Sequence, residues 1–295
     1  MEFSRRDFLK LASASAAAIG LSSLELSKAE RVLAASTKPA VIWLSGAGCT
    51  GCSISLLNAT NSTIDQVLTS TISLKYHPTL MAASGDLAVA AARSTAQAGG
   101  YILVVEDAIP TAFGGRTCYV WDEGGVPVTM AAAVSSLAAK AKAIVAVGSC
   151  ASFGGVSAAN PATGQRSVQA YLNRPTVNIP GCPAHPDWII GSLVQLIGGT
   201  TPSLDSYRRP TAYFGGEVIH ENCPRQERSK ATAFAQNGLC LRNLGCKGPV
   251  THGDCESRKW NNAQNWCIGA NGLCIGCTEP SFPSFPLHSV VSGGD

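Results

Sequence analysis

Short apolar runs and longer helical stretches alternate from residue 39 to about residue 197. The apolar runs have the length and side chains typical of strands, and they are Ala40–Ser45, Ile72–Lys75, Tyr101–Val105, Ala143–Val147 and Thr176–Ile179. Stretches rich in Ala, Leu and Val lie between them, at Asp86–Gln97, Thr129–Lys140 and Trp188–Leu196. Strands separated by helices of this length indicate a parallel sheet that is covered on both faces. We therefore expect an α/β fold with a flavodoxin-like doubly wound parallel sheet.

The pattern changes after about residue 201. Regular periodicity fades, Gly, Pro and Asn become more frequent, and seven of the twelve cysteines fall between Cys223 and Cys277. A segment with little periodic secondary structure needs cross-links to hold a fold, and metal ligation contributes folding free energy directly. We expect a flavodoxin-like domain over residues 36–200, followed by a smaller, irregular domain over residues 201–295.

The first thirty-five residues have the pattern of an export signal. Arg5 and Arg6 precede Phe-Leu-Lys, an Ala-rich apolar stretch follows from Leu11 to about Leu24, and small residues lie around Ala34. The apolar stretch is too short for an anchor, and the paired arginines are typical of the twin-arginine route. We therefore expect a periplasmic protein that is exported folded. Its cysteines can then receive metal in the reducing cytoplasm, which weakens the alternative of disulfides.

Composition narrows the possible functions. Hydrophobic residues make up 45% of the 295 residues and charged residues 14%, which excludes a disordered chain and indicates a surface partly covered by a partner. The net charge of +3 is too small to indicate a nucleic-acid partner. After the signal, no apolar run reaches the length of a membrane span, so no transmembrane helix is expected.

Three of the predicted strands lead directly into a loop with glycine and cysteine. Cys49 and Cys52 follow the first strand, Cys150 follows the fourth and Cys182 follows the fifth. Ligands of open parallel sheets bind at the carboxyl ends of strands, near the point where strand order reverses. The four cysteines can therefore converge, and the glycines allow the backbone to approach a bulky inorganic group and donate N–H groups to it.

The other cysteines divide by spacing into two further sets of four ligands, which leaves Cys118 over. The sets are His220, Cys223, Cys240 and Cys246, then Cys255, Cys267, Cys274 and Cys277. Thiolates favour zinc or iron–sulfur clusters. Spacing alone does not distinguish three structural zinc sites from three clusters.

Ordered motifs along nearly all of the mature chain resemble those of the small subunits of nickel–iron hydrogenases, and most closely the soluble nickel–iron–selenium branch. They include Gly48–Ser53, Ser73–Pro78, Ala108–Thr111, Gly148–Cys150, Pro180–Pro183, His220–Pro224, Gly245–Pro249, Asn265–Cys267 and Cys274–Cys277. The resemblance implies three 4Fe–4S clusters in an electron-transfer chain, with no catalytic residue in this subunit. The implied ligands are Cys49, Cys52, Cys150 and Cys182 for the proximal cluster, Cys255, Cys267, Cys274 and Cys277 for the medial cluster, and His220, Cys223, Cys240 and Cys246 for the distal cluster.

The resemblance also implies partners and a reaction. A large subunit with the nickel–iron site would interconvert hydrogen with two protons and two electrons. The proximal cluster would face that site, and an external carrier such as a multihaem cytochrome c would dock near the distal cluster. Basic residues near the distal ligands could form the docking patch or an ordinary solvated surface, and they are Arg225, Arg228, Lys230, Arg242 and Lys247.

Four positions depart from common family patterns. Gly48 stands where many members carry a glutamate, so that carboxylate is absent here. Gly51 and Gly155 stand where oxygen-tolerant members have two extra cysteines, which implies an ordinary proximal 4Fe–4S cluster. Cys267 stands where standard members have proline, and a thiolate there implies a medial 4Fe–4S rather than a 3Fe–4S cluster.

Two alternatives remain at this stage. One is the iron–sulfur subunit of another exported oxidoreductase, because the quinone-reductase subunit with a flavodoxin-like cluster domain would fit the N-terminal half. The other is a disulfide-stapled periplasmic binding protein, which requires six disulfides from the twelve cysteines.

Overall fold

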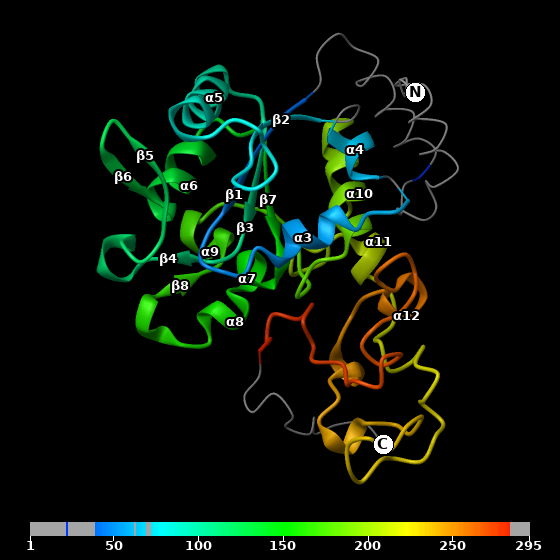
Figure 1. Ribbon diagram of the computed structural model, residues 1–295. Helices are drawn as coiled ribbons and strands as arrows, with labels where there is room; N and C mark the ends of the chain where they lie inside the picture. The colour runs from blue at the N-terminus through cyan, green and yellow to red at the C-terminus, as the bar shows by residue number, and fades with distance from the viewer. Residues whose placement is uncertain (1–21, 23–38, 62, 69–71, 284–295) are drawn as a thin grey trace.

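The computed structural model describes Ser22 and residues 39–61, 63–68 and 72–283 (Figure 1). The predicted signal, residues 1–35, lies outside this described part apart from Ser22. A five-stranded parallel sheet forms the centre of the N-terminal region, in the order β2-β1-β3-β7-β9. Its strands are β1 Ala40–Ser45, β2 Ser73–Tyr76, β3 Ile102–Glu106, β7 Ala143–Val147 and β9 Val177–Ile179.

The strand order reverses next to β1, because the chain leaves β1 for β2 and then returns to place β3 on the other side of β1. This is the order of flavodoxin-like sheets, whose ligand sites lie at the carboxyl ends of the strands that flank the reversal. β1 and β7 have the predicted bounds, β2 and β3 are shifted by one residue, and β9 begins one residue late. The predicted α/β class and parallel sheet are confirmed.

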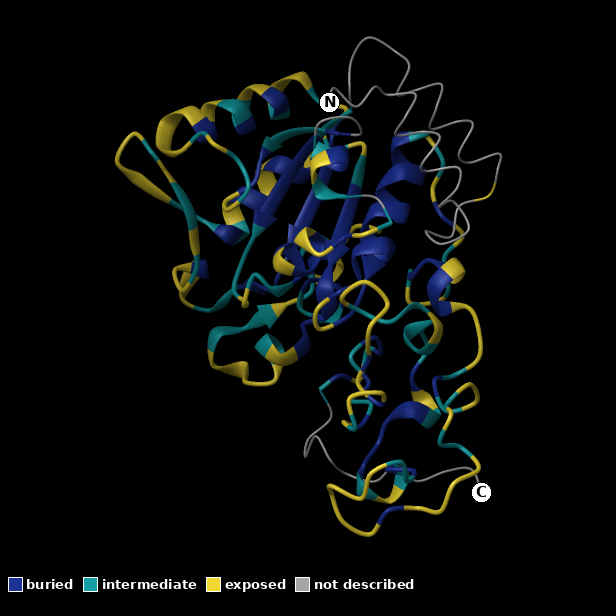
Figure 2. Cartoon of the chain, turned by 45° about the vertical axis from the view of Figure 1, so that its right-hand side comes forward, coloured by how far each residue is buried: buried dark blue, intermediate teal, exposed yellow. Residues whose placement is uncertain are grey.

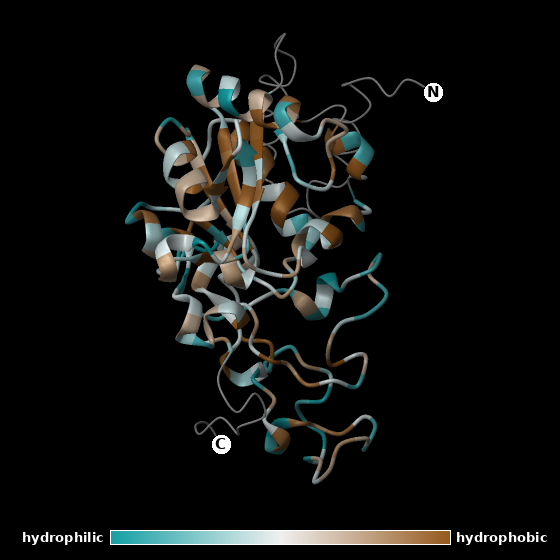
Figure 3. Cartoon of the chain, turned by 60° about the vertical axis from the view of Figure 1, so that its left-hand side comes forward, coloured by the Kyte–Doolittle hydropathy of each residue, from teal (hydrophilic) through white to brown (hydrophobic). Residues whose placement is uncertain are grey.

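Strand side chains alternate between two hydrophobic cores, as period-two geometry requires. Val41 and Trp43 point toward α3 and α10, whereas Ile42 and Leu44 point toward α5 and α6. Figure 3 shows the strands as the most hydrophobic part of the molecule. The covering helices are α3 Gly51–Leu57, α5 Gly85–Ala98, α6 Met130–Ala138 and α10 Pro186–Ile197.

Helix α10 is buried along its whole length, whereas α5 has an exposed outer face (Figure 2). A helix that is apolar on all sides is stable only inside a protein. Its first turn is fixed by Pro186 and by His185, whose Nδ1 accepts the Asp187 N–H at 3.1 Å. The start of α10 is therefore held firmly beside the loop that carries Cys182.

The remaining elements are short. The helices are α4 Ile64–Gln66, α7 Gly148–Phe153, α8 Gly155–Ala158, α9 Val168–Leu172, α11 Thr211–Phe214 and α12 Cys255–Arg258. The strands are β4 Ile109–Pro110, β5 Tyr119–Glu123, β6 Val126–Thr129 and β8 Gln165–Arg166. The β5–β6 hairpin was not predicted, although Gly124-Gly125, both at positive φ, is a sequence signal for a two-residue hairpin turn.

Residues 201–283 consist mainly of turns and short helical segments, as the fading periodicity predicts. They have a small core of their own that includes Ile219, Leu241, Trp266, Ile268 and Leu273. In Figure 1 this segment, coloured yellow to red, lies beyond the end of the sheet near α3 and α7. Within the described residues, no helix is long and apolar enough to cross a membrane.

Candidate metal centres

All twelve cysteines lie in the described part of the chain, and each is a free thiol. The disulfide-stapled alternative, which required six disulfides, is therefore wrong for this structure. The question becomes which thiols the fold brings together.

The four strand-end cysteines meet at the carboxyl end of the sheet. Cys49 lies in the loop after β1 and Cys182 in the loop after β9, but Cys52 lies in the first turn of α3 and Cys150 in α7. Two of the four therefore stand on short helices rather than on loops as expected. Burial, together with repulsion from Cys150 and Cys49, raises the pKa of Cys182 to about 11. Burial also raises the pKa of Cys52, with a smaller contribution from Cys182.

Glycine is required where these segments approach one another. Gly148, at φ 85°, begins α7, and a Cβ there would lie 2.6 Å from Cys52 Sγ. Polar hydrogens point at the sulfurs: the Ala184 N–H donates to Cys52 Sγ at 3.4 Å and the Ser157 hydroxyl to Cys150 Sγ at 3.5 Å. Hydrogen bonds of this kind tune the potential of iron–sulfur clusters.

Two adjacent carboxylates at the end of β3 support this site, and sequence reasoning missed both. Glu106 is fully buried and accepts from the Cys52 and Ser53 N–H groups and from Trp43 Nε1, each at 2.9 Å. It therefore fixes the first turn of α3, which carries Cys52. Consecutive acidic residues directly after a buried strand were the available signal.

Asp107 fills the space beside Gly48. A Cβ on Gly48 would lie 1.9 Å from Asp107 Oδ1, so a side chain at position 48 and this carboxylate exclude each other. Burial and the nearby Glu106 raise the pKa of Asp107 to about 7, although N–H groups of Cys49, Gly46 and Thr50 lower it. Its other oxygen, Oδ2, is buried without a hydrogen-bond partner in the described structure. A carboxylate thus lies beside Cys49 even though position 48 has none.

The second cysteine set gathers in the C-terminal segment. Cys255 begins α12, Cys267 and Cys277 lie in turns, and Cys274 lies in an irregular segment. Burial raises the pKa of Cys274 to about 12 and that of Cys255 well above its usual range. Repulsion from Cys277, Cys274 and Cys267 contributes to the shift at Cys255, so all four thiols are neighbours.

The third set surrounds one small cavity. His220, Cys223, Cys240 and Cys246 all line it, together with Arg225. The Arg225 N–H donates to Cys223 Sγ at 3.4 Å. All twelve predicted site residues therefore fall into the three groups expected from sequence.

The donor chemistry of these groups fits iron–sulfur clusters. Each group offers three or four sulfur donors in a largely buried setting, and N–H or hydroxyl groups point at several of the sulfurs. Among the described residues, no three His, Cys, Asp or Glu side chains are arranged to hold a single metal ion.

The three groups are contiguous. The second and third meet where the Cys274 N–H donates to Cys246 Sγ at 3.4 Å. The first and second meet at Cys277, because Cys182 lies close enough to contribute to the shift in the pKa of Cys277. The order in space is therefore the strand-end set, the Cys255 set and the His220 set.

The basic residues near the third group do not form one exposed patch. Arg228 and Lys230 are exposed, Arg225 and Arg242 are half-buried, and Lys247 is buried. Because Lys247 is buried, neither alternative, a docking patch or an ordinary solvated surface, describes it.

Family models match most of the chain. Residues 49–196 match the model described as NADH ubiquinone oxidoreductase, 20 Kd subunit, and residues 215–287 match the C-terminal model of NiFe/NiFeSe hydrogenase small subunits. The C-terminal match separates this chain from other exported oxidoreductases. Residues 2–22 match the twin-arginine translocation signal, which confirms the predicted export route.

Relatives match over nearly the full length. The chain is 43% identical to the periplasmic nickel–iron–selenium hydrogenase small subunit of Desulfomicrobium baculatum, covering 96% of this chain and 97% of the relative. It is 41% identical to the periplasmic nickel–iron hydrogenase small subunit 1 of Nitratidesulfovibrio vulgaris, covering 95% and 90%. A solved structure of H2-activated nickel–iron–selenium hydrogenase from Dm. baculatum has a TM-score of 0.81 at 42% identity, covering 87% of this chain and 100% of that chain. The chain therefore belongs to the family of nickel–iron hydrogenase small subunits and is an exported, periplasmic member of it.

Proposed function

We propose that this chain carries electrons between the nickel–iron site of a hydrogenase large subunit and an external redox carrier, through three 4Fe–4S clusters. The observation that carries the proposal is the set of three contiguous groups of thiols, which begins at the carboxyl end of the sheet and continues through the C-terminal segment. The proposed ligands are Cys49, Cys52, Cys150 and Cys182 (proximal), Cys255, Cys267, Cys274 and Cys277 (medial), and His220, Cys223, Cys240 and Cys246 (distal).

The protein's part in this function is to hold, space and shield the clusters. When bound, the clusters supply one-electron redox chemistry. Cys52, Cys240 and Cys246 are buried, which keeps water away from part of the first and third sites, and N–H groups directed at the sulfurs would stabilise the reduced, more negative state. Because the pKa values of these thiols are raised, ligand binding must release protons. Cluster assembly would also contribute to folding, since an unfolded chain does not hold the ligands together.

One face of the chain fits a large partner subunit. Ile54 and Leu57 on α3 are 55% and 41% exposed, although both are apolar. A cleft of about 520 Å³ begins beside Ile54 and runs between Cys182 and Cys267, which are both exposed. Exposed apolar side chains beside cluster ligands indicate a surface that is buried in the assembled enzyme. We assign this face to the large subunit.

A division of the chain near residue 200 is also part of the proposal. The second and third sets lie after this point and share a small core around Trp266. Tyr213 and Phe214 of α11 pack into the core beneath the sheet, so the segment after residue 200 starts attached to the N-terminal domain. Residues 36–200 would hold the proximal cluster and residues 201–295 the other two.

The test is reduction of the heterodimer by hydrogen. Added to the oxidised complex without any mediator, hydrogen should reduce all three clusters, as followed by electron paramagnetic resonance. The chain purified alone should show no such reduction, because the hydrogen-activating site belongs to the partner. Reduction by hydrogen in the isolated chain would contradict this division of labour.

A further inference from the structure

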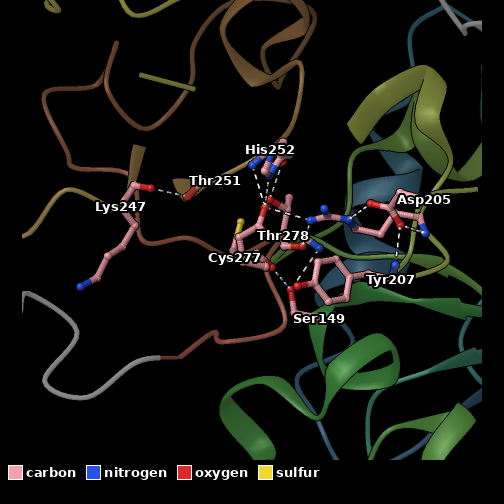
Figure 4. Close-up of polar contacts among 11 residues, drawn as sticks. Ser149, Asp205, Tyr207, Lys247, Thr251, His252, Cys277 and Thr278 are labelled. Atoms are coloured by element: carbon pink, nitrogen blue, oxygen red, sulfur yellow. Dashed lines mark hydrogen bonds and ion pairs between the residues drawn. The ribbon is translucent and has the colours of Figure 1, made fainter. Parts of the chain in front are cut away.

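Ser149 is buried between the two ligand sets nearest the sheet. It is 1% exposed and directly precedes Cys150, a proposed proximal ligand. None of the roles described so far uses its hydroxyl group, which lies where α7 meets the C-terminal segment (Figure 4).

The Ser149 hydroxyl links three ligand-bearing segments. It donates to the backbone carbonyl of Cys277, a medial ligand. It accepts from the Gly181 N–H at 3.0 Å, and the Ser149 N–H donates in return to the Gly181 carbonyl at 3.0 Å. Gly181 directly precedes Cys182. One side chain therefore joins the backbones beside two proximal ligands to that of a medial ligand.

From this geometry we infer that Ser149 is a positioning residue that fixes the separation of the proximal and medial clusters. The inference rests on the proposed function, because it requires both clusters to be present. When bound, the two clusters would supply one-electron redox chemistry at the sites formed by the proximal and medial cysteines. Ser149 contributes by holding the distance, on which the rate of electron transfer depends steeply.

The joint between the medial and distal sets also includes a hydroxyl group. There the Cys274 N–H donates to Cys246 Sγ, the Lys247 N–H donates to the Cys274 carbonyl, and the Thr251 hydroxyl donates to the Lys247 carbonyl at 2.6 Å. At the proximal–medial joint the corresponding hydroxyl is that of Ser149, which donates to the Cys277 carbonyl. Ser149 is therefore the side chain through which the proximal–medial spacing can be changed by mutation.

The segment after Cys277 has a second anchor, so loss of the hydroxyl should not unfold it. Arg209, which is 2% exposed, donates to the Thr278 carbonyl and to Glu279, each at 2.9 Å. Without Ser149, Cys277 would remain on an anchored segment but would lose its direct side-chain link to the proximal loops.

The test is Ser149→Ala in the intact heterodimer, with Ser149→Thr as the variant that keeps the hydroxyl. Ser152→Ala is the matched control, because Ser152 is also buried on α7 but donates to the Ala146 carbonyl at 3.1 Å. The readouts are iron content, the magnetic interaction between the reduced proximal and medial clusters, and the rate at which electrons from hydrogen reach the medial cluster after rapid mixing.

We expect Ser149→Ala to keep its iron but to alter the magnetic interaction between the two reduced clusters. Electrons from hydrogen should reach its medial cluster several-fold more slowly. Ser149→Thr and Ser152→Ala should resemble the wild type in all three readouts. Loss of iron in Ser149→Ala, with iron retained in Ser149→Thr, would overturn the inference, because the hydroxyl would then be needed for cluster assembly rather than for spacing. The inference is overturned if Ser149→Ala matches the wild type, or if Ser149→Thr is as impaired as Ser149→Ala. Failure of the proposed function would instead appear in the wild type, as missing clusters.

Discussion

At the residue scale, the Asp107 carboxyl group occupies the space that a side chain at position 48 would need, so Asp107 requires glycine at position 48. The aspartate has a positive φ of 72° and places one oxygen where a Cβ of residue 48 would stand. Three loop N–H groups gather on its carboxylate and fix the loop that carries Cys49. A non-glycine residue in the left-handed region costs free energy, so the surrounding contacts must stabilise it.

We therefore expect Gly48→Ala to destabilise the protein by about 1–3 kcal/mol, the usual range for overpacking a buried site. Adding Asp107→Gly should recover part of this loss, because it removes the clashing atoms and relieves the positive φ but also removes the carboxylate that interacts with the loop N–H groups. The measurements are the apparent melting temperature of the heterodimer and its iron content. Gly216→Ala is the control, since a Cβ there has open space around it. Asp107→Gly alone completes the cycle, and a loss in the double variant equal to the sum of the two single losses would show that the positions act independently.

Cys267 determines the type of the medial cluster in our account. Cys267→Pro removes the fourth ligand atom, so the medial cluster should become 3Fe–4S, with a higher reduction potential, while the other two stay intact. Electron paramagnetic resonance of the oxidised variant should show a new 3Fe–4S signal that the wild type lacks. The control is Cys118→Ala, because Cys118 lies outside the three sets and should change no cluster. A stoichiometric 3Fe–4S signal in the wild type would remove Cys267 from the ligand set.

At the residue scale, the sequence predicted the groups of ligands but not the residues that hold the ligand-bearing loops in place. Cysteines are chemically distinctive, and their spacing suffices to divide them. Glu106, Asp107 and Ser149 belong to common residue types, and their roles depend on which loops meet in space. Glu106, for example, accepts a hydrogen bond from Ser53, which lies 53 positions away in the sequence. Such long-range pairing cannot be read from local spacing.

At the scale of elements, a buried ion-pair network joins residues 205–209 to the segment that follows Cys277. Arg209 pairs with Asp205 at 2.7 Å and with Glu279 at 2.9 Å, and Glu279 also accepts the His252 N–H at 2.7 Å (Figure 4). Removing one partner of a buried pair leaves the other charge uncompensated.

Arg209→Leu should accordingly destabilise the protein by about 3–5 kcal/mol. The exposed Arg116 serves as the control, because Arg116→Leu should stay within about 0.5 kcal/mol of the wild type. Thermal unfolding of the heterodimer measures both. We expect the Arg209 variant to lose medial iron first on heating, because Thr278 and Glu279 directly follow Cys277. Similar melting of the two variants would contradict a structural role for the network.

Among the elements, the sheet was predictable because its strands are continuous apolar runs at regular spacing. Helix α7 was missed because it is only six residues long and begins directly after β7. The β5–β6 hairpin was missed because Tyr119–Glu123 is half-exposed and polar in part, so no apolar run marks it.

At the scale of the whole molecule, the exposed apolar side chains of α3 define the face assigned to the large subunit. Ile54→Arg should weaken pairing with the large subunit, because a buried charge without a partner is costly at an interface. Leu87→Arg is the control, since Leu87 is 76% exposed on the far helix α5. Co-purification of the two subunits measures the effect. If both variants pair as well as the wild type, the partner binds elsewhere.

The central claim is that the three groups of ligands hold iron–sulfur clusters, and metal analysis tests it most directly. The heterodimer should be purified without oxygen and assayed for iron, acid-labile sulfide and zinc. Three clusters predict about 12 iron and about 12 sulfide in this subunit, beyond the metal of the large subunit. Stoichiometric zinc with little iron and no sulfide would contradict the account.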